Sequence, residues 1–225
     1  MRILFCLFLL STLCFFSQSS RCSECSQPPV RILVLGSSTA EGTGASIPRN
    51  SWVSQLENKL KKSNKSASVI NFGRSGYSTF HILPSNSSYE NRPPPDVERN
   101  ITKALELNPT LVIINMPSND ASYGYSNEEQ LRNYRIMVDL LERRKIRYLI
   151  ISPQPRNFTS MQTRKQQLSL HHSLKSEFSR NFVDVWQVLV DGDLGLKDAF
   201  GSGDGIHLND FGHAYIFEQV YARMK

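Results

Sequence analysis

Short apolar runs alternate with amphipathic segments along most of the chain. The runs have the length of strands and cover residues 30–35, 67–72, 111–115, 147–151 and 182–185. Between them, apolar residues recur every three or four positions, as on the buried face of a helix. Helices are therefore expected around residues 52–60, 97–105, 126–141, 170–178 and 210–225. This alternation predicts an α/β fold, a three-layer α/β/α sandwich around a five-stranded parallel sheet.

The first residues do not follow this pattern. Arg2 precedes an apolar run at residues 3–16, and a polar patch follows at residues 17–20. The run is shorter than the roughly 20 residues that a membrane span needs. These features are typical of a cleavable secretory signal, which we expect to occupy residues 1–19. The protein is therefore predicted to be secreted or periplasmic, with no stable membrane span after cleavage; an uncleaved membrane anchor is the alternative.

A short tail, residues 20–29, precedes a single domain that we predict over residues 30–225. Cys22 and Cys25 form a C-x-x-C pair in this tail. A thioredoxin-type pair would follow a strand, and a zinc site would need a second pair of ligands. A local disulfide and free thiols are both compatible with the sequence. A lipid anchor on Cys22 is disfavoured, because Arg21 occupies a position where a small residue is expected.

Composition and charge are those of an ordinary globular chain. With 225 residues, 40% of them apolar, the chain can bury a core without disulfides or metals. The formal net charge is +6, and part of it lies between Arg132 and Arg147, on one expected helix and its exit. A basic helix face can bind nucleic acid, but no interleaved aromatic residues or nucleic-acid motif accompany this one. We therefore expect a solvated helix face and no nucleic-acid partner.

The carboxyl ends of the strands are where open α/β sheets bind their ligands. After the first expected strand, residues 36–42 read GSSTAEG. The small residues permit a tight turn that can expose Ser38 beside free backbone N–H groups. The segment lacks the ending of a phosphate-binding P-loop and does not match G-x-S-x-G. Because Gly and Ser are also common in plain turns, this segment alone is weak evidence.

Three further segments have comparable features. Residues 71–76 read NFGRSG, where a glycine can offer an unobstructed backbone N–H, and Asn119 follows the third expected strand with its amide free to meet a ligand. Near the C-terminus, the spacing of Asp204 and His207 lets the carboxylate contact the imidazole and fix its tautomer. Each segment has an alternative as a plain turn or helix cap. Together, however, they lie where this architecture builds its site.

In this order and spacing, the four segments resemble the blocks of the SGNH hydrolases, also called GDSL-type esterases and lipases. The resemblance extends from about Arg31 to the end of the chain and implies a flavodoxin-like sandwich. It also implies a catalytic triad of Ser38, His207 and Asp204. In such a triad the histidine activates the serine to attack an ester carbonyl, and an acyl-enzyme forms. No metal or organic cofactor is expected.

The same resemblance implies an oxyanion hole. The sequence also departs from the family pattern at two positions. The hole would combine the Ser38 N–H with Gly76 and Asn119; Gly73 is the less favoured match for the glycine. Ser37 stands where the family usually has aspartate, which related esterases tolerate. Pro117 stands where the family usually has glycine, which affects the local turn rather than the asparagine.

A longer stretch of sequence around Ser38 indicates the substrate. Residues 36–46, with residues 51–53 after them, resemble secreted carbohydrate-type esterases more than long-chain lipases, and no extended apolar lid is visible. The resemblance implies hydrolysis of a short acyl ester, such as acetate, on a carbohydrate or glycan. The alternatives are a lysophospholipase, a thioesterase or an acyltransferase with the same triad, and a non-catalytic glycan-binding module. The complete set of motif residues argues against the binding module. The oligomeric state is open.

The last candidates for a functional role are one long irregular segment and the remaining histidines. Residues 77–96 form a segment rich in Ser, Asn and Pro, and a loop of this length is often functional. His81 lies in this segment and is a candidate to line the pocket. His171, His172 and His213 are expected on helix surfaces or in packing.

Overall fold

Five parallel strands form one sheet in the order β2-β1-β3-β4-β5 in this computed structural model, which describes residues 30–224. The strands are β1 Arg31–Gly36, β2 Ser68–Asn71, β3 Leu111–Asn115, β4 Arg147–Ile151 and β5 Phe182–Val183. The chain runs from β1 outward to β2 and then returns to β3 on the other side of β1. This reversal makes the carboxyl ends of β1 and β3 a topological switch point, which is where doubly wound sheets bind ligands.

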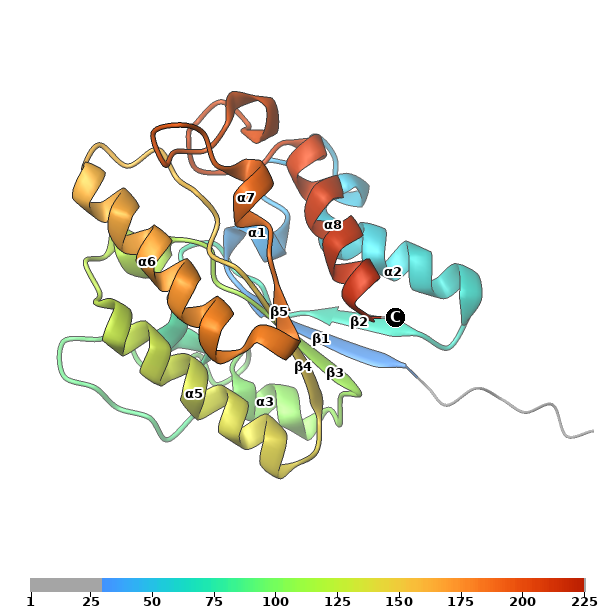
Figure 1. Cartoon of the computed structure of the whole chain (residues 1–225). Coiled ribbons are helices and arrows are strands. Elements are labelled where there is room, and N and C mark those ends of the chain that lie inside the picture. The colour runs from blue at the N-terminus through green and yellow to red at the C-terminus, as the bar shows by residue number, and fades with distance from the viewer. Residues whose placement is uncertain (1–29, 225) are drawn as a thin grey trace, which may run out of the picture.

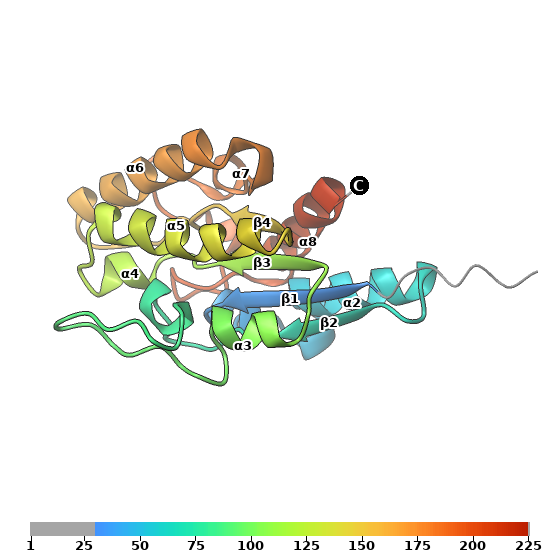
Figure 2. The ribbon, with the colours of Figure 1, turned by 90° about the horizontal axis from the view of Figure 1, so that it is seen from below.

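Helices cover both faces of the sheet (Figure 1). One face carries α3 Ile101–Glu106, α5 Asn127–Arg143 and α6 Met161–Glu177; the other carries α2 Trp52–Ser63 and α8 Asp210–Met224. The two layers are also separated by the sheet in the view from below (Figure 2). Short helices α1 Ser38–Glu41, α4 Asn119–Ser122 and α7 Trp186–Leu189, and the 3-10 turns Pro48–Asn50, Thr79–Ile82, Ser179–Asn181 and Asp198–Phe200, lie in the connections. The predicted three-layer α/β/α sandwich is therefore confirmed.

Each face of the sheet has its own apolar core, because successive strand side chains point to opposite faces. On β1, Leu33 and Leu35 pack with residues of α3, α5 and α6, whereas Ile32 and Val34 pack with residues of α2 and α8. All residues of β3 are buried. A strand covered on both faces must be apolar throughout, which is why this element was plain in the sequence.

The helices begin where a polar side chain can accept a free backbone N–H of the first turn. Ser51 accepts from Ser54 at the start of α2, and Ser126 and Glu129 form the predicted capping box of α5. The expected helix at residues 97–105 starts later than predicted. Asn100 caps α3 by accepting from the Lys103 N–H, and Val97 lies outside the helix with 57% of its surface exposed.

The predicted signal, residues 1–19, and tail, residues 20–29, lie outside the described residues. Between residues 30 and 224, no helix combines the length and apolarity needed to cross a membrane.

The two ends of the long segment at residues 77–96 are bonded to each other. The Tyr77 hydroxyl donates a short hydrogen bond to Asp96, and the Asp96 N–H donates to the His81 carbonyl at 2.9 Å. Inside the segment, Phe80 is buried, and Arg92 lies 4.4 Å from the ring centroid of Tyr125. These contacts make the segment part of the packed structure rather than an apolar lid over the strand ends.

Candidate active site

The turn after β1 places Ser38 at the first position of α1. Gly36 is required here, because a Cβ at this position would lie 2.4 Å from the Ala40 Cβ and 2.9 Å from the Asn115 carbonyl oxygen. The Ser38 side chain is only 6% exposed. Its backbone N–H has no acceptor among the described residues, as expected at the start of a helix.

Asp204, His207 and Ser38 form a continuous line of hydrogen-bonding atoms. The His207 Nδ1 lies 2.6 Å from the Asp204 Oδ2, and the His207 Nε2 lies 3.1 Å from the Ser38 Oγ. A carboxylate only accepts, so Nδ1 carries the proton and Nε2 is left to accept the serine hydroxyl. This is the tautomer that a histidine needs to act as a general base toward serine.

Asp204 is stabilised as an anion by its own loop. Its Oδ1 accepts from the backbone N–H groups of Ile206 and His207, both at 2.8 Å, and from the Ser202 hydroxyl at 3.3 Å. Burial alone would raise its pKa. The hydrogen bonds from the His207 backbone and ring and from Ile206 outweigh that effect and lower the pKa of Asp204 to about 2.

Two neighbouring segments position the histidine loop. A Cβ on Gly44, whose φ is +93°, would lie 2.2 Å from the Leu208 carbonyl oxygen and 3.0 Å from the His207 Cβ, so only glycine permits this contact. On the other side, the Gln154 Nε2 donates to the Ile206 carbonyl at 2.6 Å, and its Oε1 accepts from the Thr39 hydroxyl at 3.0 Å. Gln154 therefore connects α1 directly to the loop that carries His207.

Two hydrogen bonds hold the turn that contains Gly76 beside α4, the helix that Asn119 begins. Gly76 has a φ of +83°, and its N–H has no acceptor among the residues the structure describes. Its carbonyl accepts from the Tyr123 hydroxyl at 2.8 Å. One hydrogen of the Asn119 amide bonds the Tyr77 carbonyl at 2.9 Å, which leaves the other hydrogen for a ligand.

Gly73 differs from Gly76 in both respects. Its N–H donates to the Asn71 Oδ1 at 2.9 Å, so it is already used. A Cβ on Gly73 would lie 2.6 Å from the Glu41 backbone nitrogen. The requirement for glycine at position 73 is therefore one of close packing against α1, and Gly76 is the glycine with a free donor.

Asp120 connects the Gly76 turn to α4. Its carboxylate accepts from the Thr79 N–H at 3.0 and 3.1 Å and from the Thr79 hydroxyl at 2.5 Å, and Asn133 donates to that hydroxyl at 2.8 Å. Burial raises the pKa of Asp120 to about 6, although the bonds from Thr79 act in the opposite direction. A second connection runs from Glu41, which accepts from the Ser75 N–H at 2.8 Å.

The two departures from the family pattern are accommodated locally. Ser37 is buried, its N–H donates to the Asn115 carbonyl at 3.2 Å, and its hydroxyl has no partner among residues 30–224. Pro117 contributes its carbonyl, which accepts from the Gln154 N–H at 3.2 Å and from the Gln167 Nε2 at 2.8 Å. Asn119 still begins a helix directly after this turn.

The other histidines that were candidates contact residues outside the triad. His81 stacks on Tyr77 with ring centroids 4.7 Å apart, and its Nδ1 accepts from the Ser78 N–H at 3.0 Å; the structure records no contact with the triad. His213 is buried, and its ring lies between the Trp52 N–H and the Thr43 carbonyl. Buried His171 packs on aromatic rings, and His172 is exposed, as expected for helix and packing positions.

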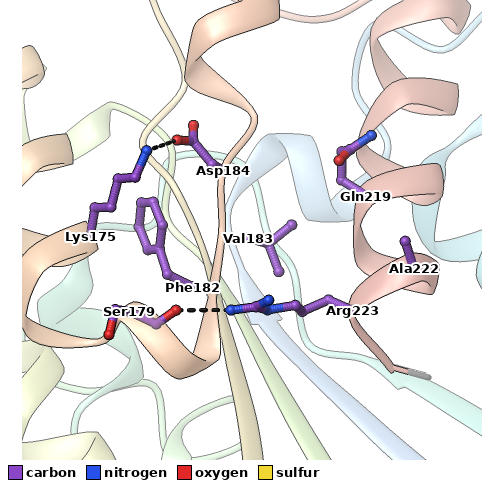
Figure 3. A pocket seen from close by; sticks show the side chains of 8 residues that line it. All are labelled: Lys175, Ser179, Phe182, Val183, Asp184, Gln219, Ala222 and Arg223. Carbon is purple, nitrogen blue, oxygen red and sulfur yellow. Dashed lines mark hydrogen bonds and ion pairs between the residues drawn. The ribbon is translucent and has the colours of Figure 1, made fainter.

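The larger hollows lie away from Ser38. One of about 420 Å³ opens between α6, β5 and α8, where the Lys175–Asp184 ion pair borders it (Figure 3). Another, of about 440 Å³, lies at the amino ends of the strands around Arg147 and Arg180. Next to the histidine loop are smaller ones of about 160 and 210 Å³, lined in part by Gly205 and by Gly44. Among the described residues, no cluster of His, Cys, Asp and Glu is arranged to hold a metal ion.

Sequence reasoning identified the residues with free or reactive groups but missed those that position them. Gln154, Asp120 and Tyr123 carry no motif of their own. Gln154 follows the end of β4, so the rule that directed attention to the other strand ends applies to it as well. Asp120 and Tyr123 become visible only when side chains from separate loops are brought together.

The comparisons with known proteins identify one family. The sequence model of the GDSL-like lipase/acylhydrolase family matches residues 34–215. A comparison with curated protein sequences found no match.

Several solved structures are similar to this chain. Psychrotrophic esterase EstA from Pseudoalteromonas sp., in a structure inhibited by monoethylphosphonate, has a TM-score of 0.63 and 18% identity, over 86% of this chain and 96% of that chain. A carbohydrate acetylesterase family member from Sinorhizobium meliloti has a TM-score of 0.58 and 19% identity, over 87% and 98%. The acetyl xylan esterase AlAXEase has a TM-score of 0.64 and 14% identity, over 87% and 100%. At these identities the likeness shows a common fold.

Proposed function

The chain belongs to the GDSL-like lipase/acylhydrolase family and is a hydrolase of ester bonds, and we propose that Ser38 is its nucleophile, with His207 as general base and Asp204 as the group that orients it. The observation that carries this proposal is the line of contacts at 2.6 and 3.1 Å from the Asp204 carboxylate through the imidazole to the Ser38 Oγ. A buried serine with a base in hydrogen-bond reach, itself oriented by a third group, is the arrangement that activates a hydroxyl nucleophile.

The proposed reaction has two halves. In the first, His207 takes the Ser38 proton as the Oγ attacks the ester carbonyl, and the oxyanion accepts from the Ser38 and Gly76 N–H groups and the free Asn119 amide hydrogen. The histidine then returns the proton to the leaving alcohol, which leaves an acyl-enzyme. In the second half, His207 takes a proton from water, which attacks the acyl group, and Ser38 regains its proton as the acid departs.

We further propose a short acyl ester, first of all acetate on a carbohydrate or glycan, as the substrate. The segments at residues 36–46 and 51–53 support this choice, and so do the similar structures named as acetylesterases. The packing of residues 77–96 against the domain also supports it, because it leaves no apolar lid to enclose a long acyl chain. Residues 1–19 have the pattern of an export signal, so we propose that the protein is secreted or periplasmic.

The test of the nucleophile uses the adjacent serines. Wild-type protein should be labelled by a fluorophosphonate probe and should hydrolyse 4-nitrophenyl acetate, and Ser38→Ala should lose both. Ser37→Ala is the matched control, because the Ser37 hydroxyl is buried without a partner in the described structure; it should keep both. Labelling of Ser38→Ala at the wild-type level would refute the assignment, and a wild-type protein that is neither labelled nor active would indicate a glycan-binding module.

A series of 4-nitrophenyl esters with acyl chains of increasing length tests the substrate. A steep fall in kcat/KM beyond acetyl is expected. A rise toward long chains would favour the lysophospholipase or thioesterase alternative. Transfer of the acyl group to an added sugar in place of water would favour an acyltransferase.

A further inference from the structure

Arg156 lies in the segment after β4 that contacts the catalytic loop. Two hydrogen bonds fix this segment there: the Gln154 Nε2 donates to the Ile206 carbonyl at 2.6 Å, and the Asn157 N–H donates to the Gly205 carbonyl at 2.8 Å. Arg156 is therefore placed between two residues that are themselves bonded to the turn between Asp204 and His207.

Arg156 is half-buried, and its guanidinium contacts the ring of Phe158 but no acceptor. It forms no hydrogen bond or ion pair with any residue from 30 to 224. A guanidinium carries five N–H donors and keeps its charge in proteins, so partial burial without an acceptor is unfavourable. Burial lowers the pKa of Arg156, while the nearby Tyr123 and Asp204 raise it.

The neighbouring Asp204 forms an ion pair with His207 and not with this cation. Its oxygens already accept from Ser202, from the backbone of Ile206 and His207, and from the His207 ring. The positive charge beside the triad therefore remains available to a ligand.

The orientation of Arg156 is prepared by its surroundings. Its guanidinium carbon lies 4.9 Å from the ring centroid of Phe158. Phe158 is fixed in turn by Arg164, whose Nε donates to the Phe158 carbonyl at 2.6 Å and whose Nη1 donates to the Asp193 carbonyl at 3.0 Å. A guanidinium stacked on an aromatic ring loses little further freedom when its planar fork binds an anion.

An exposed aromatic ring lies on the same side of the site. Tyr123 is 49% exposed, and its hydroxyl donates to the Gly76 carbonyl. A rigid aromatic ring with a polar tip suits a substrate that is partly apolar and partly wet, such as the face of a sugar. Arg156, close to Asp204 and Tyr123, and Tyr123, bonded to the Gly76 carbonyl, thus place one cation and one open ring near the site.

From these contacts we infer that Arg156 is a specificity-determining residue that binds a carboxylate carried by the ester substrate, as on an acidic sugar. Guanidinium groups bind carboxylates through paired, charge-assisted hydrogen bonds. The preferred substrate is then a short acyl ester of a negatively charged glycan rather than of a neutral one. This inference rests on the proposed esterase function of Ser38 and names the substrate class of the same site.

The experiment compares charged and neutral forms of one ester. Acetate release is measured from 3- and 4-acetoxybenzoate and from their methyl esters. Wild-type protein should prefer a carboxylate form by roughly tenfold in kcat/KM, the low end of what a hydrogen bond to a charged group contributes. Arg156→Gln should abolish that preference by raising KM for the carboxylate forms, and Arg156→Lys should retain part of the preference. Continued hydrolysis of the methyl esters by Arg156→Gln would show that the variant is folded.

Controls separate the possible failures. Arg180→Gln removes the same charge at the opposite end of the sheet and should leave the preference intact; an equal loss in both variants would mean a general effect of net charge and would overturn the inference. Equal hydrolysis of charged and neutral esters by wild type and by Arg156→Gln would overturn the inference alone. No hydrolysis of any ester by wild type would overturn both proposals. A preference for 4-acetoxyphenyl phosphate over the carboxylates would reject the acidic sugar as substrate.

Discussion

Asp120 offers a sharp test of the electrostatics behind the proposed oxyanion hole. Asp120 is buried, and its carboxylate accepts hydrogen bonds from the Thr79 N–H and hydroxyl, so it connects the Gly76 turn to α4 inside the fold. Burial raises its pKa from the ordinary value of 3.8 to about 6. The folded protein therefore binds a proton on Asp120 at pH values where the unfolded chain has already released it.

The sign and size of the effect follow by linkage. Because the folded-state pKa exceeds the unfolded one, the free energy of unfolding falls as the pH rises from about 4 to about 6. The interval corresponds to about 3 kcal/mol, since one pKa unit is about 1.4 kcal/mol. Asp120→Asn removes this titration while its amide oxygen can still accept from Thr79.

Urea unfolding at closely spaced pH values from about 3.5 to 7 measures the effect as a difference. The stability of wild type minus that of Asp120→Asn should fall by about 3 kcal/mol over this range and level off only near pH 7. Asp139→Asn, which removes one exposed carboxylate of α5, is the control for the loss of a charge. A difference that is constant or rises with pH for Asp120→Asn would show that its hydrogen bonds outweigh its burial, contrary to the reasoning.

Two further substitutions test how the site is built. Gly44→Ala should place a Cβ against the Leu208 carbonyl and the His207 Cβ and lower kcat more than tenfold. Gly124→Ala, which has a positive φ but no neighbour within 4 Å, should cost only about 1 kcal/mol of stability and keep activity; equal losses in the two would refute a steric role for Gly44. Asn119→Ala should lower kcat by about 10²–10³ with little change in KM, and a change in KM alone would make Asn119 a binding residue.

The strands were predictable where burial leaves no choice of residue. The predictions at residues 111–115 and 147–151 coincide with β3 and β4, because both are apolar runs in the middle of the sheet. The prediction failed at an edge. The run at 182–185 forms a strand only over Phe182–Val183, since the Asp184 carboxylate accepts the Trp186 N–H and starts α7.

The start of α3 was wrong for a related reason. Val97 continues the apolar spacing of Ile101 and Leu105, and spacing alone extends the helix to it. In the structure, Asp96 is bonded to Tyr77 and to the His81 carbonyl, which fixes the backbone before residue 97 outside the helix. A tertiary contact between the ends of the 77–96 segment therefore overrides a local periodicity, and no pattern within residues 97–105 could have indicated it.

The substitution of proline for the family's glycine at position 117 shows what a sequence motif does and does not specify. A glycine is indispensable where the backbone needs a positive φ or has no room for a Cβ, and Pro117 fixes φ near −65°, so this turn needs neither. The position acts through its carbonyl, which accepts from Gln154 and Gln167, and proline keeps that carbonyl. Proline lacks only the N–H. The contacts that position Asn119 come instead from the Tyr77 carbonyl and from Asp120 bound to Thr79, so the geometry of the asparagine does not depend on the residue that departs from the motif.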